Sequence, residues 1–165
     1  ETENIDSMNC LIDWLPKNLP SEKRTGIVHG DYSLTNVMIG KNDPNVIAIL
    51  DWELSTLGDP CADFNYHCLQ YIMNPKLADK DYCRNQGIPV IDEYVKMYSE
   101  KINVDLTEEW DLYSAYNLFK LAGILQGILG RVRDGTAAHE NAAERASGVR
   151  NLSDKAWDLV EKNFL

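Results

Sequence analysis

Two short runs of hydrophobic residues separated by a polar turn form the clearest pattern in the chain. The runs cover residues 37–39 and 46–50, and residues 41–45 between them are the polar and proline residues that are typical of turns. Two strand-length runs joined by such a turn predict a β-hairpin.

The register of this hairpin decides which polar groups meet at its open end. If Gly40 faces Val46, an antiparallel pairing places Asn36 opposite Leu50 and next to Asp51. The sequence therefore predicts an amide and a carboxylate side by side at the open end of the hairpin.

The chemistry of these groups suggests phosphoryl transfer. Asn36 and Asp51 offer oxygen atoms to Mg²⁺, which usually takes one or two protein ligands together with substrate phosphates. Asp31 lies five residues before Asn36 and is placed to accept the proton of a hydroxyl group. A metal clamp beside a proton acceptor is what phosphoryl transfer from a nucleotide to an alcohol requires.

Most of the remaining chain has the three- and four-residue hydrophobic spacing of helices. In the first helix, Ile5, Met8, Ile12 and Leu15 are expected to face the core. In the second, Asp59 is the expected cap and Tyr66 is expected to face the core, whereas residues 54–60 before it are expected to be turns. The predicted helices cover residues 4–18, 61–72, 89–103, 107–133 and 147–162, with helix or linker over residues 137–148 that contains His139. The predicted fold class is α+β and mostly helical.

Composition narrows the class of protein. A chain of 165 residues predicts a single domain over residues 1–165, and its net charge of −10 argues against nucleic acid and anionic membranes as partners. This charge suits a cationic substrate or simply a soluble surface. Four cysteines without Cys-x-x-Cys spacing favour an intracellular, reducing compartment, and no signal peptide or membrane-spanning run is visible.

Three motifs over residues 27–66 carry a family resemblance. They are His-Gly-Asp-Tyr-x-Leu-x-Asn at 29–36, Val-Ile-Ala-Ile-Leu-Asp-Trp-Glu at 46–53 and Leu-Gly-Asp-Pro-x-Ala-Asp at 57–63. In this order they resemble the aminoglycoside phosphotransferase-like (choline kinase-related) small-molecule kinases. The most similar branch is the one found fused to acyl-CoA dehydrogenases.

The resemblance implies a role for each matching residue. Asp31 corresponds to the catalytic aspartate, and Asn36 and Asp51 correspond to the magnesium ligands. His29 and Asp63 correspond to residues that support the catalytic loop. The implied cofactors are Mg²⁺ and ATP or another nucleoside triphosphate.

The resemblance also implies a protein-kinase-like C-terminal lobe with the small hairpin at its catalytic edge. No glycine-rich phosphate loop and no strand lysine precede the catalytic loop, so the N-terminal nucleotide lobe is expected to be missing from this chain and the fragment alone to be inactive. Trp52 and Glu53 are candidates for shaping the pocket of a small-molecule hydroxyl acceptor. The fusion partners favour a hydroxyacyl acceptor whereas the acidic charge favours a cationic one, and the sequence leaves this choice open.

Two other interpretations remain. Ser33 stands where the branch commonly has a basic residue, and Thr35 where it commonly has Asp or Gly, which favours a non-catalytic binding or interaction module on the same fold. The third interpretation is an unrelated helical domain with a coincidental motif. A structure that lacked the hairpin over residues 37–50 would favour the third.

Overall fold

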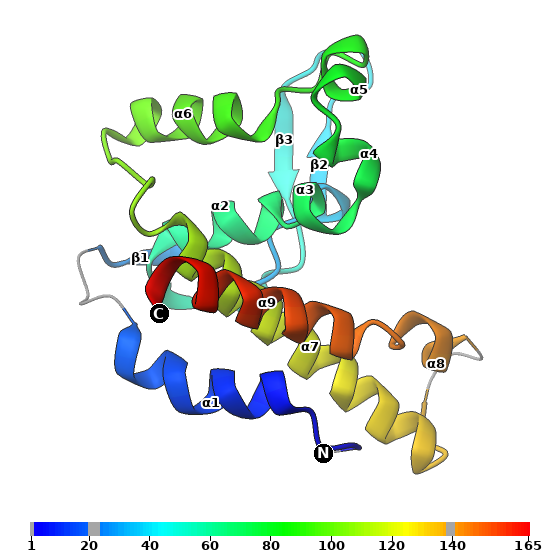
Figure 1. Cartoon of the computed structure of the whole chain (residues 1–165). Coiled ribbons are helices and arrows are strands. Elements are labelled where there is room, and N and C mark those ends of the chain that lie inside the picture. Colours follow the sequence, from blue (N-terminus) through cyan, green and yellow to red (C-terminus); the bar gives the residue numbers. More distant parts are fainter. Residues whose placement is uncertain (1, 20–23, 138–140) are drawn as a thin grey trace. The chain divides into compact units, whose positions relative to one another are not determined.

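The computed structural model of the chain describes residues 2–19, 24–137 and 141–165, so His139 lies outside the described residues (Figure 1). The chain divides into two compact units, the first made of residues 1–20 with 111–165 and the second of residues 21–110. Each unit is described by itself, and a single domain over residues 1–165 stays a prediction.

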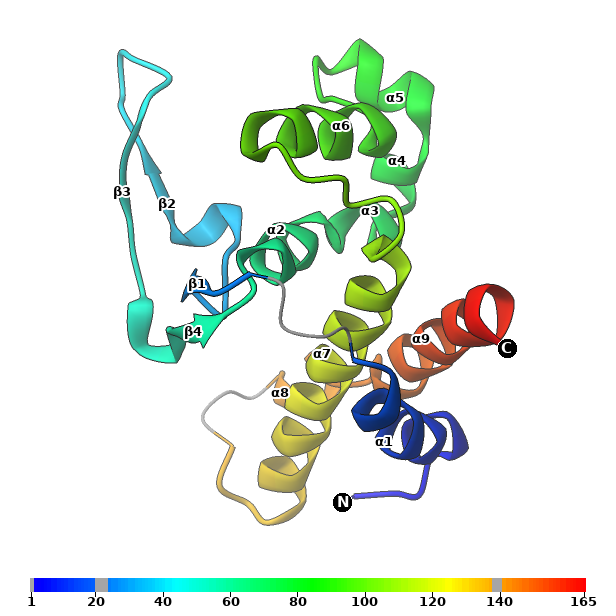
Figure 2. The same cartoon turned by 90° about the vertical axis from the view of Figure 1, so that its left-hand side faces the viewer.

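The strands in the described part of the second unit form two antiparallel pairs. Strands β2 (Val37–Ile39) and β3 (Val46–Ile49) form the predicted hairpin, which is confirmed. Strands β1 (Gly26–Val28) and β4 (Thr56–Gly58) form a second pair that the sequence did not predict. Figure 2 shows both pairs on one side of helix α2. The expectation of turns alone over residues 54–60 was therefore wrong, because a strand of three residues leaves too little periodicity to recognise.

The hairpin register is as predicted at the open end but not at the turn. The amide of Leu50 donates to the carbonyl oxygen of Asn36 over 2.8 Å. The register then shifts by one residue between Met38 and Ile39, because Ile47 is an extra residue on β3, so the amide of Gly40 donates to the carbonyl oxygen of Asn45 and does not face Val46. The wrong register near the turn does not affect the open end of the hairpin, where Asn36 and Asp51 lie.

In the described part of the second unit, five α-helices follow the strands, and short 3-10 helices cover Leu34–Asn36 and Trp52–Leu54. Asp59 caps α2 as predicted, because its carboxylate accepts from the amide of Cys61 over 2.9 Å and Pro60 occupies the first helical position. The predicted helix over 61–72 is broken at Leu69 into two helices. The helices are α2 (Pro60–Cys68), α3 (Gln70–Met73), α4 (Pro75–Ala78), α5 (Lys80–Asn85) and α6 (Ile91–Ile102).

The core of this unit is built around α2. Phe64 is buried, and its ring stacks on that of Tyr98 from α6 with 3.8 Å between the ring centroids. Cys61, Cys68 and Leu69 are buried beside it. Tyr66 is only half-buried, and its hydroxyl group has a polar partner that is described below, so its assignment to the core was wrong.

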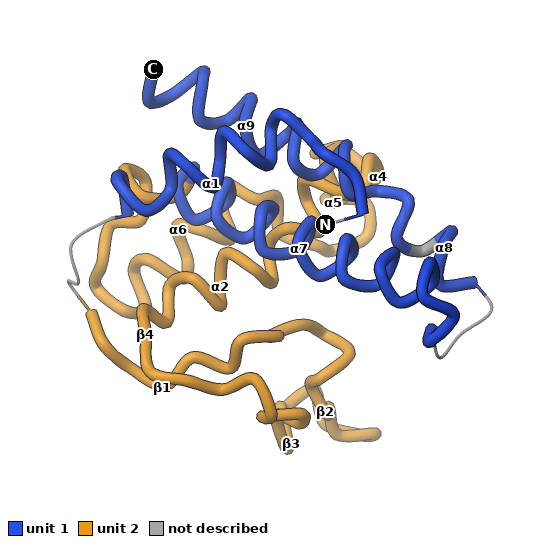
Figure 3. Tube along the Cα trace, turned by 90° about the horizontal axis from the view of Figure 1, so that it is seen from below, with its two compact units in different colours: residues 1–20, 111–165 blue, residues 21–110 orange. Residues whose placement is uncertain are grey.

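The first unit is helical (Figure 3). Helix α7 begins at Trp110, the last residue of the second unit, and not at the predicted Thr107. The carboxylate of Asp105 accepts from the amide of Thr107 over 2.9 Å, and residues 107–109 form a turn before the helix. The helices are α1 (Asp6–Asn18), α7 (Trp110–Arg133), α8 (Ala142–Arg145) and α9 (Val149–Phe164). None of the helices in the described ranges is long and apolar enough to cross a membrane.

Helix α1 packs along α9 within this unit. Ile5, Met8 and Leu15 are buried as predicted, but Ile12 is 48% exposed and its neighbour Leu11 is fully buried in its place, so the prediction was wrong at Ile12 alone. The buried hydroxyl of Ser7 lies 3.0 Å from that of Ser153 and donates to the carboxylate of Asp154 over 2.7 Å. This contact satisfies the polar groups that the helix pair buries.

Candidate functional site

A loop over residues 29–36 joins β1 to β2 and carries the first motif. Its turn depends on Gly30, whose φ is +86°. A Cβ atom at this position would lie 2.5 Å from the carbonyl oxygen of Leu54. Only glycine fits both the backbone conformation and the close approach.

His29 links this loop to the end of β3. Its ring is buried, with 3% exposure. The amide of Asp31 donates to Nδ1 over 3.2 Å, so the ring proton lies on Nε2, which donates to the carbonyl oxygen of Leu50 over 2.7 Å. Because Leu50 directly precedes Asp51, His29 holds the loop beside the strand end that carries this carboxylate.

Helix α2 holds the same loop from the other direction. The carboxylate of Asp63 accepts from the backbone amide of His29 and from that of Gly30, the latter over 3.0 Å. Asp63 lies in the first turn of α2, where the positive end of the helix favours a carboxylate. The sequence placed Asp63 near this backbone, and the structure shows the hydrogen bonds.

Asp31 and Asn36 are joined across the loop. Asn36 Nδ2 donates to the backbone carbonyl oxygen of Asp31 over 2.9 Å and to its carboxylate over 3.2 Å. Both partners are acceptors, which fixes the amide orientation. The Oδ1 atom of Asn36 is therefore directed away from Asp31 and can accept a cation.

Asp51 follows β3 in a left-handed conformation, with a φ of 65°. Strained conformations of this kind in non-glycine residues are concentrated at functional sites. Its side chain is exposed and makes no capping hydrogen bond to the turn that follows. The backbone of Leu50 pairs with that of Asn36, and Asp51 follows Leu50 directly. The side chains of Asn36 and Asp51, which are the two candidate metal ligands, therefore belong to neighbouring ends of the two strands.

A cluster of three or more His, Cys, Asp or Glu residues that could hold a metal ion is absent from the part of the chain that the structure describes. The donor set at the hairpin end is one amide and one carboxylate, Asn36 and Asp51. This set suits Mg²⁺, which keeps waters or substrate phosphates in its other positions.

Arg24 is a structural residue of the site that the sequence did not reveal. Its Nε donates to the Asp59 carboxylate over 3.0 Å, and its guanidinium also pairs with Glu109. The bridge fixes the residue that caps α2 and so supports the helix that carries Asp63. No local pattern predicts a contact between positions 24, 59 and 109.

Tyr66 is a second contact that the sequence did not reveal. Its hydroxyl group forms a hydrogen bond with the Asp31 carboxylate. Burial raises the pKa of Tyr66 to about 12, and the negative charge of Asp31 adds to the rise. The phenol is therefore protonated at neutral pH and acts as the donor.

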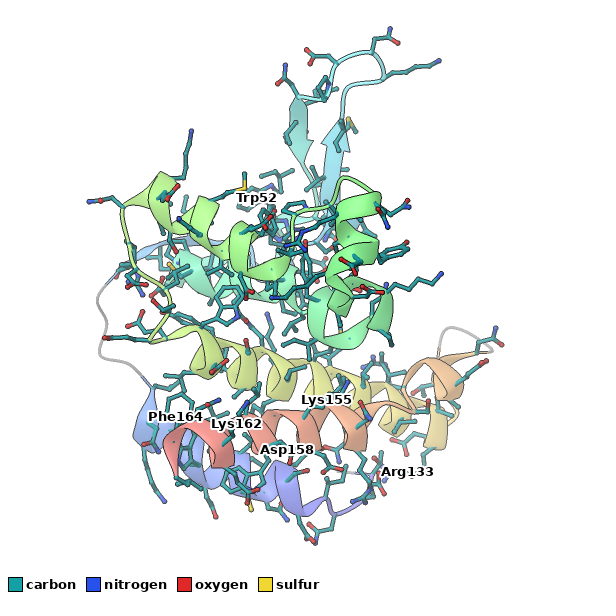
Figure 4. All side chains as sticks on the ribbon, turned by 45° about the horizontal axis from the view of Figure 1, so that its top comes forward. Trp52, Arg133, Lys155, Asp158, Lys162 and Phe164 are labelled. Atoms are coloured by element: carbon teal, nitrogen blue, oxygen red, sulfur yellow. The ribbon has the colours of Figure 1, made fainter. Side chains whose placement is uncertain are left out.

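A pocket of about 520 Å³ opens beside His29. Trp52, which is labelled in Figure 4, lines it. Its Nε1 donates to the carbonyl oxygen of Ile49 over 2.8 Å. Glu53 is exposed and is not among the residues that line it. Asp63 and Lys101 are the acidic residue and the lysine among the residues that line it. The other aromatic rings of the lining belong to Tyr32, Phe64, Tyr94 and Tyr98.

The mostly helical unit, the hairpin and the loop held by His29 and Asp63 define a kinase-like phosphotransferase fold. A sequence profile of the phosphotransferase enzyme family matches residues 2–116, and the chain belongs to this family. The family match and the observed hairpin exclude an unrelated domain with a coincidental motif.

The chain is similar to longer proteins. It is 38% identical to acyl-CoA dehydrogenase family member 10 of Mus musculus, over 98% of the chain and 16% of that protein. It is 32% identical to acyl-CoA dehydrogenase family member 11 of Homo sapiens, over 98% of the chain and 21% of that protein. The chain thus spans about a sixth to a fifth of these relatives.

A solved structure shows the same fold. The crystal structure of a "putative aminoglycoside phosphotransferase" from Ralstonia eutropha superimposes with a TM-score of 0.90 at 40% sequence identity. The match covers 100% of this chain and 52% of that one. The predicted mostly helical, kinase-like fold and the predicted family are therefore confirmed.

Proposed function

We propose that the chain is the catalytic-loop lobe of a small-molecule kinase, which transfers the γ-phosphoryl group of a nucleoside triphosphate to a hydroxyl group. The observation that carries the proposal is the hydrogen-bonded arrangement of Asp31 and Asn36 next to the strand end that bears Asp51. It supplies a proton acceptor and two oxygen donors within one short segment.

In the proposed reaction, the acceptor oxygen forms a bond to the γ-phosphorus while the bond from that phosphorus to the β,γ-bridging oxygen breaks. The hydroxyl proton passes to the carboxylate of Asp31, and the nucleoside diphosphate leaves with the bonding electron pair. Asn36 holds the carboxylate in position through its hydrogen bond of 3.2 Å. His29 and Asp63 keep the loop in place.

The proposed metal ligands are Asn36 Oδ1 and the Asp51 carboxylate. Mg²⁺ bound there supplies positive charge that neutralises the phosphate oxygens. The residues fit this ion because the amide nitrogen of Asn36 is already engaged with Asp31, and the side chain of Asp51 is exposed.

The remaining nucleotide contacts are assigned to an N-terminal lobe in the same polypeptide. The solved relative, of which this chain covers 52%, supports such a lobe. The relatives named as acyl-CoA dehydrogenase family members support a fused dehydrogenase domain in the parent protein. On this proposal the fragment alone is inactive.

The aromatic pocket beside His29 is the proposed acceptor site, and Trp52 forms part of it. Its apolar lining favours an acceptor with an apolar body. Asp63 and Lys101 both line the pocket, so charge does not decide the acceptor, and it is the apolar lining that supports the hydroxyacyl-type acceptor over the cationic acceptor that the net charge suggested. Glu53, which does not line the pocket, is left without a proposed contact.

The test uses the parent protein with its nucleotide lobe. Nucleotide turnover with Mg²⁺ is measured against hydroxyacyl compounds and amino alcohols. Asp31→Asn is expected to lower kcat by roughly 10²-fold or more. Asp81→Asn is the matched control, because this carboxylate is 91% exposed on α5, and it is expected to keep normal turnover. Near-normal turnover in Asp31→Asn would remove the residue from its role.

A second candidate function is nucleotide binding without transfer. Ser33 and Thr35, which depart from the usual loop residues, bind each other through their hydroxyl groups over 2.7 Å. The loop can therefore be built without the residues common in the branch. Magnesium-dependent nucleotide binding without turnover against any acceptor would favour this candidate.

A further inference from the structure

Helix α2 carries two polar side chains with partners in or near the catalytic loop. Asp63 and Tyr66 are three residues apart, which places them on the same face of the helix. Arg24 fixes Asp59, the N-cap of α2, and Asp63 holds the amides of the catalytic loop in the first turn.

The next group on this face meets the proposed catalytic carboxylate. Asp63 accepts from the amide of Gly30, and Asp31 is the following residue in the loop. Side chains three positions apart on a helix have their Cβ atoms about 5–6 Å apart. The spacing places Tyr66 beside Asp63 and so near Asp31, and the hydroxyl group of Tyr66 forms a hydrogen bond with the Asp31 carboxylate.

We propose that Tyr66 is a positioning residue of this site, whose hydroxyl group holds the Asp31 carboxylate in the orientation needed to accept the substrate proton. The carboxylate is then held from two directions, by Asn36 at the base of the hairpin and by Tyr66 on α2. This inference rests on the proposed phosphotransferase function. Within that function it assigns a role to a residue other than Asp31, Asn36 and Asp51.

Two contacts are needed because a single bond leaves the carboxylate free to rotate. The hydrogen bond from Asn36 reaches one carboxylate oxygen of Asp31 over 3.2 Å, at the long end of the usual range, so it anchors that oxygen and leaves the other to a second donor. A phenol donating to a charged oxygen forms a stronger bond and has few rotatable bonds of its own. Tyr66 is half-buried on α2, which limits the freedom of its ring.

The first test separates positioning from binding. In the parent protein, Tyr66→Phe keeps the ring but removes the donor. It is expected to lower kcat roughly tenfold while the KM values for nucleotide and acceptor stay within about twofold. Tyr116→Phe is the matched control, since this ring is 38% exposed on α7, and it is expected to leave both parameters unchanged. An unchanged kcat in Tyr66→Phe, with turnover intact, overturns the proposal.

The second test does not depend on activity. A fluorinated tyrosine that ionises near neutral pH is placed at position 66, and its ionisation is followed by absorbance. Replacing Asp31 by Asn is expected to lower the midpoint by roughly one pH unit, because the neighbouring negative charge is lost. An identical midpoint in both proteins shows that the two side chains do not interact and overturns the proposal. A shifted midpoint in a protein without turnover supports the contact while the proposed function fails.

Discussion

The contact between Asp63 and the catalytic loop gives the most specific test of how this site is built. The carboxylate accepts from the amides of His29 and Gly30, and hydrogen bonds to a charged group contribute about 1.5–3 kcal/mol each. In Asp63→Asn, one side-chain oxygen can still accept from one of these two amides, but the NH₂ group faces the other amide, which is also a donor. One charge-assisted hydrogen bond is therefore lost, and the other becomes a hydrogen bond between neutral groups.

The magnitude follows from these bonds. Because Asp63 is half-buried, solvent weakens part of the effect, and we take a local loss of about 2–3 kcal/mol. At 1.36 kcal/mol per factor of ten, this increases loop opening about 30- to 150-fold. Amide exchange reports local opening. Hydrogen exchange of peptides covering residues 27–33, measured by mass spectrometry on the parent protein, should therefore accelerate by this factor.

Two further variants separate this role from helix-dipole compensation. A charge at a helix N-terminus contributes about 0.3–1 kcal/mol, so loss of the dipole effect alone would accelerate exchange no more than about fivefold. Asp63→Glu keeps that charge but displaces the carboxylate, and it is expected to accelerate exchange as well. Asp81→Asn is the exposed control and should change nothing. If exchange over residues 27–33 is unaffected by Asp63→Asn, the carboxylate does not hold the loop.

Three other predictions concern single residues. Gly30→Ala combines an unfavourable φ with a clash against a backbone oxygen, so it should lower the free energy of unfolding in urea by more than about 2 kcal/mol. Gly87 has a φ of +69° but no atom within 4 Å, so Gly87→Ala should lower it by only about 1–2 kcal/mol. Equal losses in the two variants would contradict the packing argument. Burial raises the pKa of the Cys68 thiol to about 12, so iodoacetamide should label the partly exposed Cys10 first, and early labelling of Cys68 in peptide maps would be against the structure. Burial lowers the pKa of His67 from 6.5, so the unfolded chain takes up this proton more readily than the folded one, and stability should fall as the pH decreases below 6.5. His67→Gln should make the urea midpoint depend less on pH between about 7.5 and 5.5, and an unchanged pH dependence would refute the assignment.

The local parts of the fold could be predicted from the sequence. The hairpin follows from two apolar runs around a turn, and the cap of α2 follows from Asp59 before Pro60. The end of the hairpin was placed correctly because the open-end register depends on pattern, whereas the bulge near Gly40 depends on turn geometry that the pattern does not encode. Ile12 and Leu11 are neighbours on α1, so periodicity alone did not decide which of them is buried.

The non-local parts could not be predicted. Strands β1 and β4 have three residues each, which is too short for a recognisable alternation of apolar and polar side chains. They also pair across about thirty positions, so no local turn links them. Arg24 reaches Glu109 across 85 positions. Tyr66 resembles a core residue by its spacing, and only the position of Asp31 in the folded chain reveals that its hydroxyl group has a polar partner. Residues whose roles depend on partners distant in sequence leave no local signal.

The central claim is that Asn36 and Asp51 share one divalent cation beside Asp31. The most direct measurement is a crystal structure of the parent protein with Mn²⁺ and a nucleotide, in which anomalous scattering locates the ion. The account predicts one ion at coordination distance from both Asn36 Oδ1 and the Asp51 carboxylate, close to the roughly 2.0–2.2 Å of oxygen-ligand bonds to small divalent cations. An ion bound elsewhere, or these two side chains pointing apart, would contradict it.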